Sequence, residues 1–440
     1  MGKTRDKTVV QMKSGVIDYH DKLIMAILLI CIIAVPLFYD VHLYSVFDLS
    51  KITILYILTL AIVGIWSLKT LTINWKENRQ STVNDEVMKG MCGRKSFFGC
   101  GSASSHLAGA LHFPMIAFVI VTALATVFSI NPFTSLLGAY KRYDGFVSTL
   151  VYVTLFYTVV HFVERKRLPL FLDVIISTAT VAAVYGVFQH FGIDFYQWST
   201  DFGFGIRVSS TFGHPAFFSA FLSMVIPLVM IRIFSDKSNG KTCLYMAILV
   251  LLMVAFYYTK TRAAFLGLIF SLLFFFSCIG RKTLLVNKIK SVVTITIFIG
   301  FFVSANINDK TSLIGRFTQD LQLFQTGEPN TVERAGITNQ LGGTMGMRVF
   351  QNLAAVKIIR DYPVLGIGPE TLGVIYPQYL SRVYREKSEQ SNFENQNRIH
   401  NDILDMAVSR GLLGLGVYMW FIFSYVRMIW RGYKKCDDKK

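Results

Sequence analysis

Apolar residues occur along this chain in long, nearly uninterrupted runs that are separated by polar segments. A helix that crosses the hydrocarbon core of a bilayer needs roughly 20 mainly apolar residues. Ten runs approach that length, at residues 23–39, 52–68, 111–130, 147–163, 168–192, 215–231, 243–258, 263–280, 291–305 and 411–430. We therefore predict an all-α polytopic membrane protein with about ten transmembrane helices.

The composition supports this assignment and excludes other classes of protein. Of the 440 residues, 53% are hydrophobic and 16% are charged, whereas soluble domains carry about 25% charged residues. These values exclude a soluble enzyme, a disordered protein and a disulfide-rich secreted module. The six cysteines lie in the predicted spans or on their cytoplasmic side, without a nearby ligand set, so no metal is predicted.

The distribution of Lys and Arg predicts the orientation in the membrane. With the N-terminus in the cytoplasm, the segments on that side hold 27 Lys and Arg against 10 Asp and Glu. The short loops on the other side hold 6 against 5. Cytoplasmic loops are enriched in basic residues, so both termini are predicted to be cytoplasmic. Contact with anionic membrane lipid accounts for the net charge of +17, and no nucleic-acid partner is needed.

This orientation divides the chain into regions. They are a cytoplasmic N-terminal tail (1–22), a bundle of nine spans (23–305) with a cytoplasmic connector (69–110), a large extracytoplasmic loop (306–410), the last span (411–430) and a cytoplasmic tail (431–440). A loop of this length is more typical of a working lid or site than of a linker.

The large outer loop is predicted to contain amphipathic helices. Apolar residues recur at helical spacing at Val349, Leu353, Val356 and Ile359, until Pro363 stops the pattern. The glycines of the following "VLGIGPETLG" loosely resemble a nucleotide-binding loop. No strand-and-helix unit surrounds them, so a helix stop and a tight turn is the simpler interpretation.

Three arginines lie near outward helix ends, against the tendency of basic residues to stay inside. Arg142 precedes the fourth span, Arg207 precedes the sixth and Arg262 begins the eighth. Guanidinium groups bind phosphate oxygens in a bidentate way and keep their charge. The three could therefore converge on one anion, although each could also extend separately to lipid head groups.

Two histidines are candidates for proton transfer. His400 opens the helix "HNDILDMAVSRG" at the end of the outer loop, with Asn401 beside it. Histidine titrates near neutrality and can accept a proton from an attacking hydroxyl. His214 is a second candidate, but the Pro215 that follows it is equally typical of a helix start.

Several of these segments resemble the ordered motifs of the O-antigen ligase and polysaccharide polymerase superfamily. They are "KRYDGF", "RVSSTFGHPAFFSAFLSMVIPL", "TKTRAAFLGL", "MRVFQNLAAVKIIRDYPVLGIGP" and "HNDILDMAVSRGLLGL", which together extend over roughly residues 140–420. The sequence departs from the family pattern at two points. His214 stands before the proline where the family usually has Asn, and Thr261 stands before the arginine where Ser is usual.

The resemblance implies an architecture similar to GT-C glycosyltransferases in a bacterial inner membrane, with the active site on the extracytoplasmic side. It implies a glycan donor carried on undecaprenyl diphosphate, and no metal, nucleotide sugar or other cofactor. Arg207 and Arg262 would bind the diphosphate with help from Arg142 and Arg348, and His400 would deprotonate the acceptor hydroxyl. A diphosphate is already a good leaving group, so neutralising its developing charge could replace acid catalysis.

The acceptor decides between related functions. With lipid A core as acceptor the protein is an O-antigen ligase of lipopolysaccharide biosynthesis. With another lipid-linked glycan it is a repeat-unit polymerase for O-antigen, capsule or exopolysaccharide, and with a protein hydroxyl it is an O-oligosaccharyltransferase. From another class, a transporter or flippase of a lipid-linked glycan would also place arginines at an interface. A transporter should carry charge at mid-membrane and internal repeats, and the chain has little of either.

Overall fold

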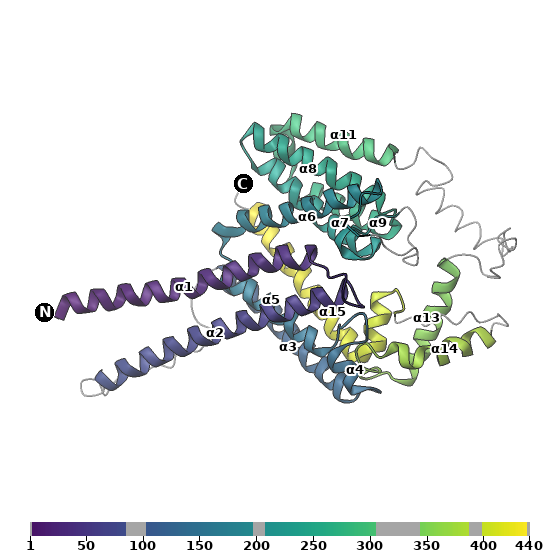
Figure 1. Cartoon of the computed structure of the whole chain (residues 1–440), viewed down its shortest axis with the longest axis horizontal. Coiled ribbons are helices and arrows are strands. Elements are labelled where there is room, and N and C mark those ends of the chain that lie inside the picture. Colours follow the sequence, from purple (N-terminus) through teal and green to yellow (C-terminus); the bar gives the residue numbers. More distant parts are fainter. Residues whose placement is uncertain (1, 85–102, 197–206, 305–343, 387–397, 438–440) are drawn as a thin grey trace. The chain divides into compact units, whose positions relative to one another are not determined.

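A computed structural model describes residues 2–84, 103–196, 207–304, 344–386 and 398–437 (Figure 1). Every regular element in these ranges is a helix, which confirms the predicted all-α class. The longer helices are α1 (Gly2–Leu37), α2 (Asp48–Asn84), α3 (Ala103–Val127), α5 (Phe146–Phe162), α6 (Leu168–His190), α7 (Pro215–Ser235), α8 (Asn239–Tyr258), α9 (Arg262–Ile279), α11 (Lys288–Ser304), α13 (Thr344–Asp361), α14 (Leu372–Glu386) and α15 (Asp402–Asp437). Short helices are α4 (Pro132–Leu137), α10 (Arg281–Val286) and the 3-10 turns η1 (Arg165–Arg167) and η3 (Ser210–Phe212).

Eight of these helices are long and apolar enough to cross a membrane, and they correspond to eight of the ten predicted spans. The other two predicted spans, 147–163 and 291–305, correspond to α5 and α11. Both of these helices have 17 residues, just below the length of the other eight. The protein is therefore an all-helical polytopic membrane protein.

The chain forms two compact units, of which the first comprises residues 1–112 and 150–178. Here α1 and α2 pack together around a core that includes Ile24, Leu28 and Ile62. Helix α1 begins at Gly2, so the predicted N-terminal tail continues the first span as helix. The predicted connector 69–110 is helical at both ends, through α2 and α3, and residues 85–102 lie outside the described residues.

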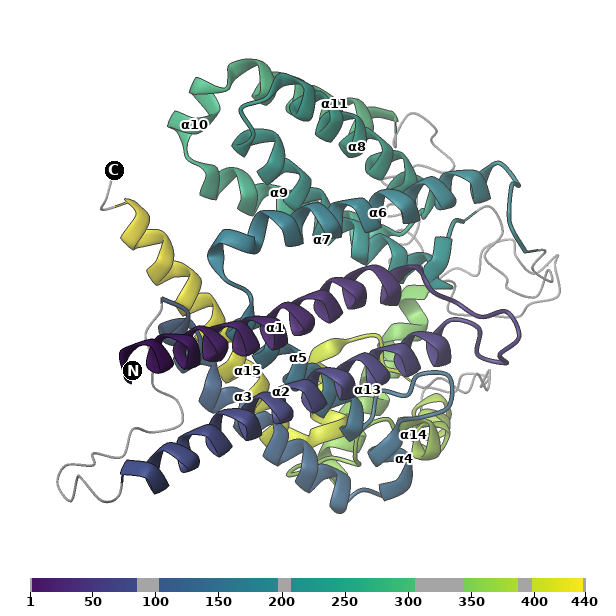
Figure 2. The ribbon, with the colours of Figure 1, turned by 60° about the vertical axis from the view of Figure 1, so that its left-hand side comes forward.

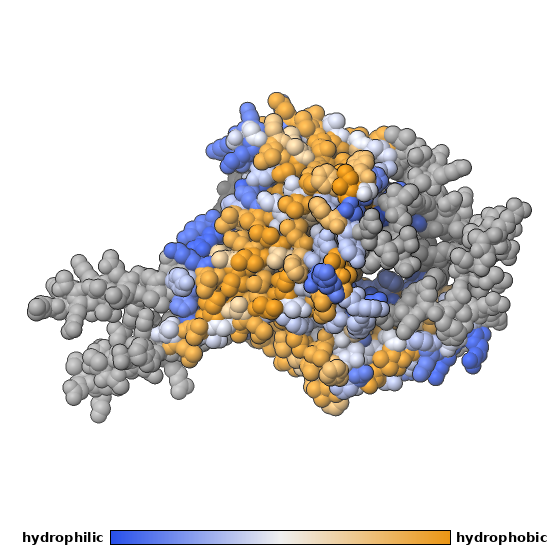
Figure 3. Space-filling view, in the orientation of Figure 1, coloured by the Kyte–Doolittle hydropathy of each residue, from blue (hydrophilic) through white to orange (hydrophobic). Residues whose placement is uncertain are grey.

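The second unit comprises residues 113–149 and 179–440 and contains the predicted site residues. Helix α7 packs against both α8 and α9, and the side chains of Phe218, Leu222 and Ile226 are fully buried. The outer faces of the helices are apolar, as in Phe270 and Leu273 of α9, which are 70% and 63% exposed. Apolar residues gather over the visible faces of the helices (Figure 3), as expected for surfaces that contact lipid tails.

Helices α13 and α14 and the start of α15 share a separate core. Figure 2 shows the ribbons of these helices. The amphipathic helix expected before Pro363 is present as α13. Of the four apolar residues in the pattern, Ile359 packs against this core, whereas Val349, Leu353 and Val356 are exposed. The buried residues of α13 are Phe350, Ala354, Ala355 and Ile358. The two alanines let α13 approach its neighbours closely, and Phe350 stacks on Tyr384 of α14 with ring centroids 4.8 Å apart.

Helix α15 is broken at the position where the last span was predicted to begin. Gly411 has φ 68° and ψ −175°, a backbone conformation that only glycine adopts readily. The amides of Leu412 and Leu413 there donate to the carbonyl oxygens of Pro363 and Val364. The glycine turn after α13 is also present, with positive φ at Gly366 and Gly368, which confirms the turn expected there.

Candidate active site

The loop of residues 138–145 presents Arg142. Its two ends are in contact, because Gly138 and Gly145 pack so closely that a Cβ atom on either would overlap backbone atoms. Within the loop, the amides of Arg142 and Tyr143 both donate to the carbonyl oxygen of Ala139, at 3.0 and 2.9 Å. The position of Arg142 is therefore fixed by a compact turn at the start of α5.

The segment before α7 is held by the end of α6. The Gln189 side-chain oxygen accepts hydrogen bonds from the amides of Ser209 and Ser210. His214 caps α7, since its Nδ1 accepts the amide hydrogen of Ala216 at 3.1 Å. The sequence left open whether His214 is a helix-start residue, and the structure shows that it is. An Nδ1 that accepts a hydrogen bond belongs to a neutral imidazole.

Arg207 is anchored between two spans. Its Nε donates to the carbonyl oxygen of Thr259, and its Nη2 donates to Thr261 Oγ1, both at 3.0 Å. Thr261 is the N-cap of α9, and Arg262 is the first residue of that helix. A helix N-terminus carries a partial positive charge, so these two arginines and the helix end create a cationic region between α8 and α9.

His400 lies at the entrance to α15. The residue before it, Ile399, is buried in the core of α13 and α14. The Asn401 side-chain oxygen caps α15 by accepting the Leu404 amide, although at 3.4 Å. Asn401 thus orients the start of α15, next to the exposed His400 side chain.

Arginines from other segments change the pKa values of the two histidines through their positive charges. Although the His400 side chain is exposed at the surface, partial desolvation of its imidazole lowers the pKa, and the positive charges of Arg348 and Arg142 lower it further. The pKa of His214 is lowered by burial first, and then by Arg207 and His400. Both imidazoles are therefore neutral at pH 7, which is the state that can accept a proton.

The structure thus brings most of the predicted site residues together. Arg142, Arg207 and Arg348 each act electrostatically on His214 or His400. Arg262 is placed beside this group through its neighbour Thr261, which contacts Arg207. Among the described residues, no group of three His, Cys, Asp or Glu side chains could hold a metal ion.

Unusual backbone conformations gather in the same loops. Six non-glycine residues among those described have positive φ: Lys141, Tyr143, Ser210, Lys260, Glu370 and His400. Such conformations cost of order 1–3 kcal/mol each and are typical of functional sites. Every one of them lies in a segment that carries or touches a candidate residue.

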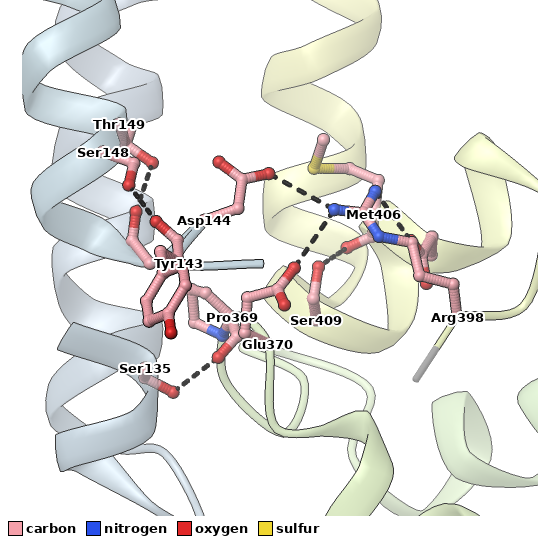
Figure 4. Close-up of polar contacts among 12 residues, drawn as sticks. Ser135, Tyr143, Asp144, Ser148, Thr149, Pro369, Glu370, Arg398, Met406 and Ser409 are labelled. Carbon is pink, nitrogen blue, oxygen red and sulfur yellow. Dashed lines mark hydrogen bonds and ion pairs between the residues drawn. The ribbon is translucent and has the colours of Figure 1, made fainter. Parts of the chain in front are cut away.

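Sequence reasoning missed a cluster of four charged residues, which we call the Arg398 cluster (Figure 4). Arg398 Nη2 donates to Glu370 Oε1 at 3.1 Å and to Asp144 Oδ2 at 3.3 Å. Its Nη1 lies 3.4 Å from Asp405 Oδ2. Each of the four stands within a few residues of a predicted site motif, so a search for charges flanking the motifs would have found them.

Glu370 is the most buried member of this cluster, with its side chain 8% exposed. Burial raises its pKa from 4.5 to about 7, against the opposing effect of Arg398. Glu370 Oε2 is buried without a hydrogen-bond partner. The pKa of Arg398 is raised, because its three carboxylate neighbours outweigh the effect of burial.

The fold and the site define a polytopic membrane protein with a cationic centre around two neutral histidines. Residues 247–419 match a family model described as O-Antigen ligase. This match confirms the resemblance to the O-antigen ligase superfamily. Arg262, Arg348 and His400 lie within the matched range, whereas Arg142 and Arg207 precede it. Comparison with curated proteins and with solved structures found no match.

The family consists of glycosyltransferase-like ligases and polymerases, which supports an enzyme that acts on lipid-linked glycans and a glycan acceptor. A role in the membrane agrees with the apolar helices of this chain.

Proposed function

We propose that this protein is a membrane glycosyltransferase of the O-antigen ligase type. It transfers a glycan from undecaprenyl diphosphate to an acceptor hydroxyl on the outer face of the bacterial inner membrane. The observation that carries this proposal is the convergence of Arg142, Arg207 and Arg348 on His214 and His400. A diphosphate needs fixed positive charge, and an attacking hydroxyl needs a neutral base.

In the proposed reaction, the acceptor oxygen attacks the anomeric carbon of the donor sugar while His400 accepts the hydroxyl proton. The bond between the anomeric carbon and the diphosphate oxygen breaks, and undecaprenyl diphosphate leaves with the electron pair. Arg207 and Arg262 bind its phosphate oxygens, and Arg142 and Arg348 add positive charge. Preorganised cations of this kind stabilise charge that develops on the leaving group.

The test uses the purified protein in detergent with an undecaprenyl-diphosphate oligosaccharide, an acceptor and EDTA. We expect release of undecaprenyl diphosphate together with a larger glycan product, whose mass identifies the acceptor. A lipid A core product defines a ligase, and a lengthened lipid-linked glycan defines a repeat-unit polymerase. Transport of the labelled donor across proteoliposomes without release would overturn the proposal.

Two variants assign roles within the same assay. Arg207→Ala should abolish transfer and weaken donor binding, because the residue binds the diphosphate. His400→Ala should lower kcat by about 10²–10⁴-fold and leave donor binding nearly unchanged, as expected for loss of a general base. Arg382→Ala is the matched control, since Arg382 lies on α14 over the ring of Tyr379. Unchanged activity in both site variants would contradict the assignment.

A further inference from the structure

The Arg398 cluster connects segments that are distant in sequence. Asp144 belongs to the 138–145 loop, Glu370 to the turn between α13 and α14, and Asp405 to the first turn of α15. Arg398 contacts all three carboxylates and stands two residues before His400. One side chain therefore links the segment that carries His400 to the loop that carries Arg142.

Each of the three segments has its own rigid support. The Arg142 loop is closed by the packing of Gly138 against its other end. The turn that bears Glu370 is fixed because Ser135 Oγ donates to the carbonyl oxygen of Pro369 at 2.9 Å. The Asp405 amide donates to the carbonyl oxygen of Asn401 at 2.8 Å. Each carboxylate of this cluster thus belongs to a segment that is held in place by its own contacts.

We propose that Arg398 is a positioning residue that holds His400 and Arg142 at the distance required for transfer. This inference rests on the proposed function and assigns a role to a residue outside the set that binds donor or acceptor. Arg398 acts through its three carboxylates, which fix the two segments relative to each other.

The chemistry of the cluster requires arginine. A planar guanidinium offers five N–H donors in a rigid fork, so it can contact three carboxylates from different directions at once. A lysine at this position keeps the positive charge but presents a single compact ammonium group. Replacement by lysine therefore separates the effect of charge from the effect of geometry.

The pH dependence of kcat can separate the effect of charge from the effect of geometry, because charged groups around His400 influence its pKa. The pKa of His400 is influenced by Arg348 of α13, by Arg142 of the loop, and by Arg398 and Asp405 of its own segment. His400 in turn lowers the pKa of His214 at the start of α7. Removal of the Arg398 charge should raise the pKa of His400. The acidic limb of the pH profile of kcat should then move to higher pH.

The experiment compares Arg398→Lys, Arg398→Gln and the wild type with a synthetic undecaprenyl-diphosphate oligosaccharide as donor. Both variants should lower kcat by about 10²-fold, the loss typical of a misplacement of about 1 Å, with a smaller change in the donor KM. Only Arg398→Gln should shift the acidic limb. A merely structural ion pair would lower the melting temperature and leave kcat of the folded enzyme unchanged.

Asp144→Asn provides a second test that preserves folding, because Asp144 is 40% exposed. It should lower kcat in the same direction as Arg398→Lys, and Arg382→Gln on α14 serves as the control. If Arg398→Lys and Asp144→Asn both keep kcat within twofold of wild type, the positioning role is wrong while the proposed function stands. If the wild type itself transfers no glycan, the proposed function fails instead.

Discussion

At the scale of single residues, the candidate site combines neutral imidazoles with a carboxylate that is half protonated near pH 7. Glu370 has this property because it is buried and because its Oε2 lacks a hydrogen-bond partner. A buried carboxylate is costly when charged. Arg398 offsets part of this cost through its hydrogen bond to the other oxygen.

This burial predicts a pH dependence of stability. The folded protein holds the Glu370 proton up to about pH 7, whereas the unfolded chain releases it near pH 4.5. Stability from this group is therefore complete below about pH 4.5 and is lost as the pH rises to about 7. Glu370→Gln should remove up to about 3 kcal/mol of this dependence. Melting curves of both proteins between pH 4.5 and 8 measure the difference.

The control for this measurement is Glu164→Gln. Glu164 is 54% exposed and pairs with Lys166 at the surface, so its replacement should leave the pH dependence almost unchanged. Parallel curves for wild type and Glu370→Gln would contradict the burial of a protonated Glu370.

At the scale of helices, the break in α15 determines where the His400 segment meets the glycine turn. Gly411 allows the backbone to pass directly against Val364. The amides of Ile367 and Gly368 in the turn also donate to the carbonyl oxygens of Val408 and Ser409, just before the break. The same turn carries Glu370, so the break contributes to the geometry of the site.

Gly411→Ala should destabilise the protein. Its backbone conformation alone costs a non-glycine residue about 1–3 kcal/mol, and an added Cβ would overlap the backbone of Val364. We expect a lower melting temperature and a loss of transfer activity. Gly416→Ala is the matched control on the same helix, where a Cβ has open space. It should leave stability unchanged or raise it by up to about 1 kcal/mol.

The sequence predicted the helices better than their inner faces. Hydrophobic runs located the spans, because a membrane helix must be apolar over its whole length. On α13 the spacing of apolar residues predicted the helix, but of those residues only Ile359 packs against the core. Alanine is only weakly hydrophobic, so it contributes little to a pattern of apolar positions. Ala354 and Ala355 are nevertheless fully buried, because small residues allow close helix packing.

The sequence could identify those candidate residues whose chemistry depends only on their residue type and on their place in a motif. Arginines and a histidine near outward helix ends could be selected by residue type alone. Charges flanking the motifs could also be selected in this way, but the contacts within the Arg398 cluster could not be predicted, since Arg398 and Asp144 are 254 residues apart. Only the folded chain brings these charges together, and the strained backbone of His400 leaves no signal in residue type.

At the scale of the whole molecule, the positions of the site residues limit which helices can cross the membrane. Arg142 follows α3 and Arg207 follows α6, and both act on His214. The two arginines are therefore expected on one side of the membrane. Since α6 is long and apolar enough to cross it, α5 must then cross as well. Likewise α11 must cross after α9, because Arg348 and His400 of the later segment lie near Arg142.

Both of these helices are short for a span. Seventeen residues of α-helix extend about 26 Å, against a hydrocarbon core of about 30 Å. Local thinning of the bilayer and extension of flanking Lys and Arg side chains to the head groups make up such a difference at modest cost. Helix α5 is followed by Arg165, Lys166 and Arg167, and α11 begins with Lys288 and is preceded by α10.

Ten spans are thus expected, with both termini in the cytoplasm, and cysteine labelling tests this topology. In a background without the six natural cysteines, Lys166→Cys and Lys288→Cys should react with a membrane-impermeant maleimide only after permeabilisation. Lys141→Cys and Arg382→Cys should react in intact spheroplasts, because they lie in the segments predicted to be extracytoplasmic. If Lys166→Cys also reacts in intact spheroplasts, α5 does not cross, and Arg142 and Arg207 would be separated by the membrane. The site could not then form, because a diphosphate cannot be bound from both sides of a bilayer at once.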